Sequence, residues 1–343
     1  MNFLPIIQKL IRQMCVPRTE IFLTLAENFN IISHLMKNVT INGKTIEHLW
    51  DKKLSSYVKN KIDRYKLVYR DLNEQETEQA LIRIVDTLLD PGVSYSGPHR
   101  LKQWEKGWSE SYNDFHGRKN IGPVYPHYFG KSMVNRLGQK FIMAISKDFQ
   151  LKITYVGLDY IFDKYLRKIE NIYDFGCGTG HNLLKVREVN KTANLIGLDW
   201  TKASQKILRK LNNSGVVDNL KTYNFDFFKP DMKIKIAQNS AIYTIGAIEQ
   251  TGDDYKKFVS YLLKNKPEIC LHIEPITELL DENSLLDYLS VKYYQKRNYL
   301  NGFLNYLRQL EKEGKIKIHE TIATHLGSMF ISGHSIIVWS PIN

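Results

Sequence analysis

The chain has 343 residues, of which 43% are hydrophobic and 24% are charged, so it can bury a core and is not an intrinsically disordered protein. Its net charge of +12 is spread along the sequence without a basic block, which leaves both a nucleic acid and a small acidic substrate open as partners. No apolar run can span a bilayer, and three cysteines without a CxxC pair fit the reducing cytoplasm and no structural zinc.

Residues 1–90 are predicted to be helical, because apolar residues recur there at spacings of three and four. The helical segments are 2–14, 20–36, 57–72 and 76–90. In the first, Lys9, Arg12 and Gln13 interrupt the apolar positions, which favours an amphipathic helix over a signal peptide. A helix lying on a membrane surface remains an alternative for that segment.

Residues 91–130 follow neither a helical nor a strand period and are dense in glycine, proline and aromatic residues. Such a stretch in a compact protein is either disordered or functional, and its aromatic content argues against disorder. We expect an ordered segment that packs on or over a binding site. The alternative is a connector whose aromatic residues serve only as core. The aromatic residues are Trp104, Trp108, Tyr112, Phe115, Tyr125, Tyr128 and Phe129.

A helix is predicted over 132–168, and strands alternate with helices from about residue 170, including a long helical segment at 281–312. This alternation is typical of a mostly parallel sheet covered on both faces. The expected strands are 171–177, 193–200, 220–228, 240–248, 268–276, 315–323 and 334–341. A short loop joins the last two, which should therefore pair antiparallel. The predicted fold is α/β, with a Rossmann-like seven-stranded, mostly parallel sheet and an antiparallel last strand at 166–343. A mainly helical N-terminal region at 1–165 precedes it.

The strongest motif is DFGCGTG at 174–180, which follows the first of these strands and opens a helix. Glycines at 176, 178 and 180 allow a tight turn and a close approach of a ligand to the main chain. The second strand ends at Asp199, whose carboxylate can accept hydrogen bonds from ribose hydroxyls. The GxGxG spacing differs from the dinucleotide fingerprint GxGxxG, and Asp174 would repel a pyrophosphate. The pattern favours a nucleoside with an ammonium group, such as S-adenosylmethionine.

With these motifs, the chain from residue 166 onward resembles the class I S-adenosylmethionine-dependent methyltransferases, whose first motif is (D/E)xGxGxG. The resemblance implies that Gly176, Gly178 and Gly180 lie at the methionine moiety, that Asp199 binds the ribose, and that Asp226 and Phe227 lie at the adenine. It places Asp174 near the amino group of the cofactor. Trp200 either stacks on the adenine or only packs, and Thr244, at the end of the fourth strand, is assigned to the cofactor as well.

The segments at 172–184, 197–200, 248–255 and 271–289, together with WEKGW at 104–108, also resemble a narrower bacterial group. Its members are described as sugar O-methyltransferases of surface-polysaccharide gene clusters. This resemblance implies a sugar hydroxyl, or another small-molecule hydroxyl, as the methyl acceptor. An aromatic segment such as 104–129 suits stacking on a sugar.

An alcohol acceptor needs a base at the carboxyl end of the fourth or fifth strand. Glu249 follows the fourth strand, and His272 and Glu274 share one face of the fifth, so these three are the predicted catalytic residues. The alternatives are a solvated loop at Glu249, a structural His–Glu pair, or a metal held by the two glutamates. Four further histidines could face the substrate, namely His116, His127, His325 and His334.

Two other functions remain open from the sequence. The first is an RNA or protein methyltransferase that binds its acceptor through a basic N-terminal region. The motif (D/N)PP(Y/F) of adenine and cytosine N-methyltransferases is missing after the fourth strand, which disfavours a nucleobase amine. The second is a non-enzymatic cofactor-binding scaffold, which the complete glycine motif disfavours.

Overall fold

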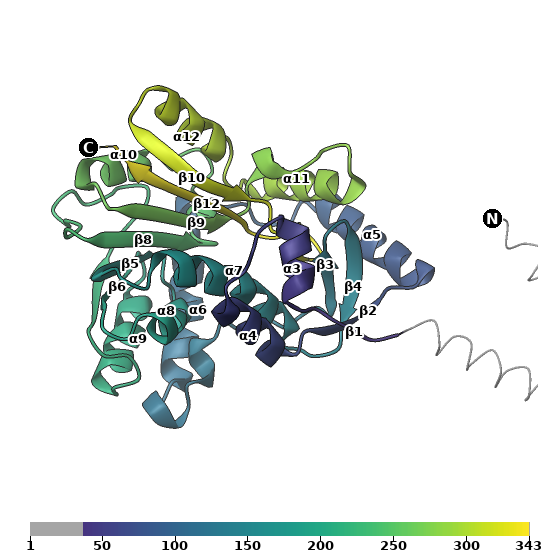
Figure 1. Cartoon of the computed structure of the whole chain (residues 1–343), viewed down its shortest axis with the longest axis horizontal. Helices are drawn as coiled ribbons and strands as arrows, with labels where there is room; N and C mark the ends of the chain where they lie inside the picture. Colours follow the sequence, from purple (N-terminus) through teal and green to yellow (C-terminus); the bar gives the residue numbers. More distant parts are fainter. Residues whose placement is uncertain (1–36, 343) are drawn as a thin grey trace, which may run out of the picture. The chain divides into compact units, whose positions relative to one another are not determined.

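The structure is a computed structural model that describes residues 37–342 (Figure 1). The helices predicted at 2–14 and 20–36 lie outside the described residues. Thr40–Asn343 form one compact unit, so the boundary predicted between residues 165 and 166 falls inside it. Among the described helices, none combines the length and hydropathy that a membrane crossing requires.

A seven-stranded sheet with the order β10-β12-β9-β8-β5-β6-β7 forms the centre of this unit. The strands are β5 (Asn171–Phe175), β6 (Asn194–Asp199), β7 (Leu220–Asn224), β8 (Ser240–Ile245), β9 (Ile269–Glu274), β10 (Ile316–Ile322) and β12 (Ser335–Pro341). The five strands from β9 to β7 run parallel, whereas β12 is antiparallel to both of its neighbours. The predicted α/β fold, with its seven strands and antiparallel last strand, is confirmed.

Helices cover both faces of this sheet, as the strand–helix alternation predicted. One face packs against α7 (Phe149–Tyr165), α8 (His181–Val189) and α9 (Lys202–Asn213), and the other against α10 (Lys256–Asn265) and α12 (Phe303–Lys312). In α12, the spacing of Phe303, Leu304, Leu307 and Leu310 gives one buried stripe. The helix predicted over 281–312 is two helices, because α11 (Leu285–Arg297) ends at Asn298, which adopts the left-handed conformation.

A second sheet has five strands in the order β1-β2-β4-β3-β11, and its strands β2, β3, β4 and β11 lie in the same unit. Its strands are β1 (Val39–Thr40), β2 (Val68–Asp71), β3 (Val134–Leu137), β4 (Lys140–Ala144) and β11 (Leu326–Ser328). The chain also forms helices α3 (Gly43–Trp50), α4 (Ser56–Tyr65) and α5 (Glu74–Leu89) in this part. Because β11 lies between β10 and β12, the connection between those two strands is not the simple short loop that the sequence suggested.

The prediction of helix over 132–168 is wrong for residues 134–144, which form the antiparallel hairpin of β3 and β4. Met133, Leu137 and Phe141 lie four residues apart and imitate a helical stripe. Gly138, with a φ of 61°, makes the turn that separates the two strands. The helix predicted over 57–72 likewise ends early, since residues 68–71 form β2.

The segment 91–130 contains the helix α6 (Leu101–Asp114), where the sequence suggested no regular structure. Trp104, Trp108 and Tyr112 recur every four residues and therefore lie on one side of it. The carboxylate of Glu105 accepts hydrogen bonds from the main-chain nitrogens of Lys202 and Ala203 at 2.7 and 3.0 Å. These contacts fix α6 to the first turn of α9, beside the end of β6.

Candidate active site

The glycine turn between β5 and α8 needs glycine for both conformation and space. Gly176, Gly178 and Gly180 have φ values of 76°, 52° and 80°, which side-chain-bearing residues rarely adopt. A Cβ atom on Gly176 would lie 2.4 Å from Cβ of Ala247, in the loop after β8. One on Gly178 would lie 2.9 Å from Cζ2 of Trp108. The bare main chain of the turn therefore lies between the end of β8 and the indole of α6.

Asp199 ends β6 next to this turn, as the sequence predicted. Its Oδ2 accepts a hydrogen bond from the main-chain nitrogen of Gly178 at 3.0 Å. Its Oδ1 accepts from the nitrogen and hydroxyl of Thr201 at 2.9 and 2.7 Å. Burial raises the pKa of this carboxyl. Since a carboxylate offers about four acceptor sites, Asp199 has about one left for a ligand.

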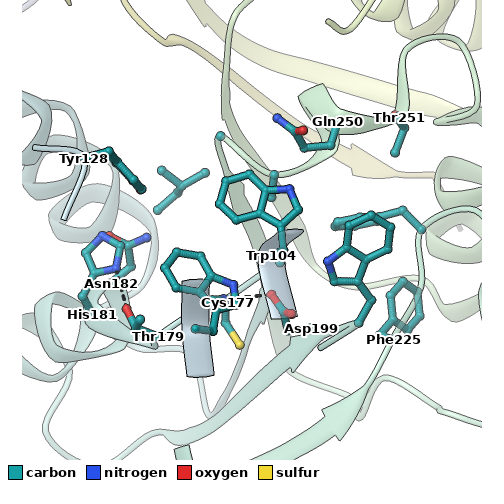
Figure 2. Close-up of a pocket in the computed structure, with 18 of the residues that line it drawn as sticks. Trp104, Tyr128, Cys177, Thr179, His181, Asn182, Asp199, Phe225, Gln250 and Thr251 are labelled. Carbon is teal, nitrogen blue, oxygen red and sulfur yellow. Dashed lines mark hydrogen bonds between the residues drawn. The ribbon is translucent and has the colours of Figure 1, made fainter. Parts of the chain in front are cut away.

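A cavity of about 80 Å³ lies over the glycine turn. Its walls include Gly176, Gly178, Asp199, Trp200 and Phe227, which are five of the residues assigned to the cofactor from the sequence. Figure 2 shows the indole of Trp104 in the centre of the residues that line this cavity. Trp104 stacks on Trp108 with ring centroids 5.4 Å apart, and Trp200 stacks on Phe228 at 6.0 Å. The cavity is thus a narrow slot between aromatic rings and a carboxylate.

Four residues assigned to the cofactor from the sequence do not line the cavity. Gly180 lies behind the turn, where a Cβ atom would meet Leu208 at 3.0 Å. The Oδ1 atom of Asp226 accepts a hydrogen bond from the nitrogen of Phe228, so its carboxylate closes a local turn. Asp174 and Thr244 are buried in their strands. The glycine turn and Asp199 line the cavity as the sequence spacing suggested, but local turns and strand packing keep these four residues out of its wall.

Asp174 differs from the other three residues because its buried carboxyl group lacks a full set of hydrogen-bond partners within residues 37–342. Its side chain is 1% exposed, and its Oδ2 atom has no hydrogen-bond partner among the described residues. Burial raises the pKa of Asp174 to about 8, so the group is uncharged over much of the neutral range. A neutral carboxylic acid beside the glycine turn attracts a cationic ligand less than the carboxylate that the sequence suggested.

A second chamber, of about 360 Å³, adjoins the slot and shares with it Trp104, Tyr128 and the residues at the end of β8. Glu249 lies in the 3-10 helix η4 (Ile248–Thr251) after β8 and lines this chamber, as does His334 just before β12. Aromatic residues make up much of the remaining wall, namely Phe129, Tyr155, Tyr293, Tyr299 and Phe330. The chamber therefore combines aromatic walls with ionisable side chains.

Glu249 and His334 form a pair in this chamber. Nε2 of His334 lies 3.9 Å from Oε2 of Glu249, whose Oε1 accepts a hydrogen bond from Gln250 at 2.8 Å. Burial raises the pKa of Glu249 to about 7 and lowers that of His334 to about 4. At neutral pH the imidazole is therefore unprotonated and can accept a proton beside a partly ionised carboxyl.

His272 and Glu274, which the sequence predicts as catalytic groups, do not line either cavity. His272 is fully buried, with Nδ1 2.9 Å from the hydroxyl of Thr244 and its ring against Phe303 and Trp339. Burial lowers its pKa to about 3. The alternation along β9 placed it correctly on one face, but α12 and β12 cover that face.

Glu274 holds the loop that carries Glu249. Its carboxylate accepts hydrogen bonds from the main-chain nitrogens of Ala247, Ile248 and Glu249 at 3.1 to 3.3 Å. Burial, and then the charge of Glu249, raises the pKa of Glu274. Its position is therefore structural, at the start of η4. Within residues 37–342, no cluster of three or more His, Cys, Asp or Glu side chains has the geometry for a metal ion.

Two residues of the chamber were not among the catalytic or cofactor-binding residues predicted from the sequence. His334 was named only as one of four candidate histidines, and Arg297 was not named. The available signal for His334 was its position just before the last strand, whose first residue, Ser335, pairs with Glu274 at the end of β9. The other three, His116, His127 and His325, do not line either cavity. Arg297 lies at the end of a helix with no motif around it, so only the folded chain brings it here.

No protein-family model and no curated protein matches the chain. Several methyltransferases are among the solved structures that resemble it. An O-methyltransferase from neocarzinostatin biosynthesis, solved with S-adenosyl-L-homocysteine, is 17% identical with a TM-score of 0.41; the match covers 57% of this chain and 56% of that one. The N-methyltransferase NodS from Bradyrhizobium japonicum WM9 is 9% identical with a TM-score of 0.43, over 69% of this chain and all of that chain. A small RNA methyltransferase is 16% identical with a TM-score of 0.42, over 59% of this chain and 28% of that one. The chain thus spans under three fifths of the neocarzinostatin enzyme.

Proposed function

We propose that the chain is an S-adenosylmethionine-dependent methyltransferase that transfers the methyl group to a hydroxyl of a small molecule. One observation carries the proposal. The slot at the glycine turn opens into an aromatic chamber that holds the pair of Glu249 and His334. A cofactor site and an acceptor site with a base thus adjoin at the carboxyl ends of the parallel strands, where ligands of such sheets bind.

The residues of the slot suit this cofactor. Gly176 and Gly178 present bare main chain to the slot, and Asp199 retains about one acceptor site for a ribose hydroxyl. Trp200, Phe227 and Phe228 supply flat apolar walls for an adenine ring. Nε1 of Trp104 is buried without a hydrogen-bond partner among the described residues and can donate to a polar group of the ligand. When bound, the cofactor supplies an electrophilic methyl group on a sulfonium.

The pair in the chamber provides the proton acceptor. His334 takes the proton of the acceptor hydroxyl at Nε2, and Glu249 stabilises the imidazolium that results. Tyr155, Tyr293 and Tyr299 exclude water and orient the acceptor by stacking. A sugar hydroxyl fits these walls, and we propose a role in surface-polysaccharide biosynthesis in the cytoplasm. The buried free thiols of Cys177 and Cys270 are consistent with that reducing compartment.

Cofactor binding tests this function directly. We expect calorimetry to show that the purified chain binds S-adenosylmethionine, and that Gly178→Val abolishes this binding because the new side chain collides with Trp108. Asp199→Ala should weaken it at least tenfold through loss of the carboxylate and of the turn that it holds. Gly314→Val is the matched control, because Gly314 also has a positive φ but an added Cβ atom there would have nothing within 4 Å. A wild-type chain that fails to bind the cofactor would refute the proposal.

The alternative acceptor is an RNA or a protein. The aromatic chamber behind the slot favours a small acceptor, because a polymer would need an open groove to reach Glu249 and His334. A methylation assay with a small-molecule hydroxyl panel and with total RNA in parallel separates the two. Transfer to RNA alone would replace the small-molecule proposal while leaving the cofactor assignment intact.

A further inference from the structure

Two arginines face the second chamber from distant parts of the sequence. Arg100 ends the 3-10 helix η1 (Pro98–Arg100), and Arg297 is the last residue of α11. The loop before η1 is tied to the end of α11, since the nitrogen of Ser96 donates to the carbonyl of Arg297 at 2.7 Å. Asn298 also donates to the carbonyl of Ser96, at 3.2 Å. These hydrogen bonds hold both guanidinium groups at one wall of the chamber.

Neither guanidinium is neutralised by an ion pair within residues 37–342. Arg100 is 7% exposed and donates to Gln103 at 3.1 Å and to Gln250 at 3.5 Å, both of which are neutral. Arg297 donates to the hydroxyl of Ser94 at 3.1 Å, and its Nε atom is buried without a partner among the described residues. Such donors are costly to bury unless something accepts from them.

The charges of the chamber do not balance. Burial, and then the positive charge of Arg297, lowers the pKa of Arg100. Glu249 can offset one of them at most, and its own carboxyl is only partly ionised at neutral pH. His334 is neutral there. The chamber thus keeps a net positive charge, with Arg100 beside Trp104 and Gln250, which line the slot as well.

We propose that Arg100 and Arg297 bind an anionic group of the methyl acceptor, a carboxylate or a phosphate, and so hold its hydroxyl at His334. The planar guanidinium fork matches both of these oxyanions and can contact them with two hydrogen bonds. An anion also relieves the repulsion between the two arginines and satisfies the buried Nε atom of Arg297. This inference rests on the proposed methyl transfer, and it narrows the acceptor to an acidic small molecule, such as an acidic or phosphorylated sugar.

The test compares glucose, glucuronate and glucose 1-phosphate. The three probes share a sugar ring and differ mainly in the presence and kind of the anionic group. Binding is measured by calorimetry on the full chain saturated with S-adenosylhomocysteine. We expect at least one anionic probe to bind ten or more times more tightly than glucose. Whichever anion binds more tightly identifies the group as carboxylate or phosphate. Equal, weak binding of all three probes would overturn the inference.

Variants assign the preference to the two arginines. Arg297→Gln and Arg100→Gln should each remove most of the anion preference, and Arg297→Lys should retain part of it, because charge remains while the fork is lost. Arg308→Gln, on the exposed side of α12, is the matched control and should change nothing. Cofactor affinity and melting temperature are measured on every variant. Loss of cofactor binding by the wild type would refute the proposed function, whereas an unchanged anion preference in both folded variants refutes only this inference.

Discussion

Glu249 and His272 show what the sequence can and cannot predict for a single residue. Glu249 follows a strand that the sequence places in the sheet, so its position at the strand end was predictable. His272 is equally well placed in its strand, yet its side chain points to the face covered by Phe303 and Trp339. Side chains alternate between the two faces of a sheet, so the sequence predicts which residues share a face. It does not predict which of the two faces contacts a ligand. That choice depends on α12 and β12, which come later in the chain.

We predict that His334→Ala lowers kcat by a factor of about 10²–10⁴, the usual contribution of a general base, with little change in cofactor affinity. His272→Gln, which changes a histidine outside both cavities, is the matched control and should keep kcat within a few-fold. Steady-state kinetics with saturating cofactor measures both. Full turnover by His334→Ala would exclude it as the base.

The pH dependence of kcat tests the carboxylate of the pair separately. Burial raises the pKa of Glu249 to about 7, so the ionised form that stabilises the imidazolium becomes populated as the pH rises through 7. Since His334 stays unprotonated above pH about 4, we expect kcat to rise up to pH about 7 and then level off. Glu249→Gln should lower kcat and abolish this rise. A rise that persists in that variant would assign it to another group.

At the scale of elements, α6 shows how packing across the chain decides a local structure. Its sequence is mostly polar, with two tryptophans and a glycine, and no helix was therefore predicted there from the sequence. In the folded chain, Glu105 caps α9, and Lys210 lies over the ring of Tyr112 at 5.1 Å. These contacts supply the stability that local propensity lacks. Trp104 and Trp108 consequently lie in the wall of the slot.

Replacing Glu105 by alanine tests this coupling of α6 to the slot. Loss of a carboxylate at the first turn of a helix costs about 1 kcal/mol, and we expect a loss of that order in the free energy of unfolding. Because α6 carries Trp104 and Trp108, the affinity for S-adenosylmethionine should also fall several-fold. Glu110→Ala, on an exposed position of the same helix, is the control. If both variants bind the cofactor as the wild type does, α6 does not hold the slot in place.

At the scale of the whole unit, the sequence predicted the seven-stranded sheet but not its connection to the five-stranded one. Alternating strands and helices are a local signal, and each strand of the larger sheet carries it. β11 has three residues and pairs with β3, almost two hundred positions earlier in the chain, so no local pattern marks it. The indole nitrogen of Trp50 donates to the carbonyl of Thr324 at 2.9 Å, next to this strand. The wall of the chamber at Leu326–Ser328 therefore depends on residues from the N-terminal half.

This dependence predicts that residues 166–343 do not fold alone, although that range holds the complete seven-stranded sheet. The fragment lacks α7, whose Val156, Leu158, Ile161 and Phe162 are fully buried against the sheet. Burial of four such side chains contributes about 6–12 kcal/mol, which is comparable with the entire stability of a domain, about 5–15 kcal/mol. Without β3, the residues of β11 also lose their main-chain partners. We expect thermal unfolding followed by circular dichroism to be cooperative for residues 40–343 and absent for 166–343. A 166–343 fragment that melts cooperatively and binds S-adenosylmethionine would show instead that the boundary drawn from the sequence separates two independent domains.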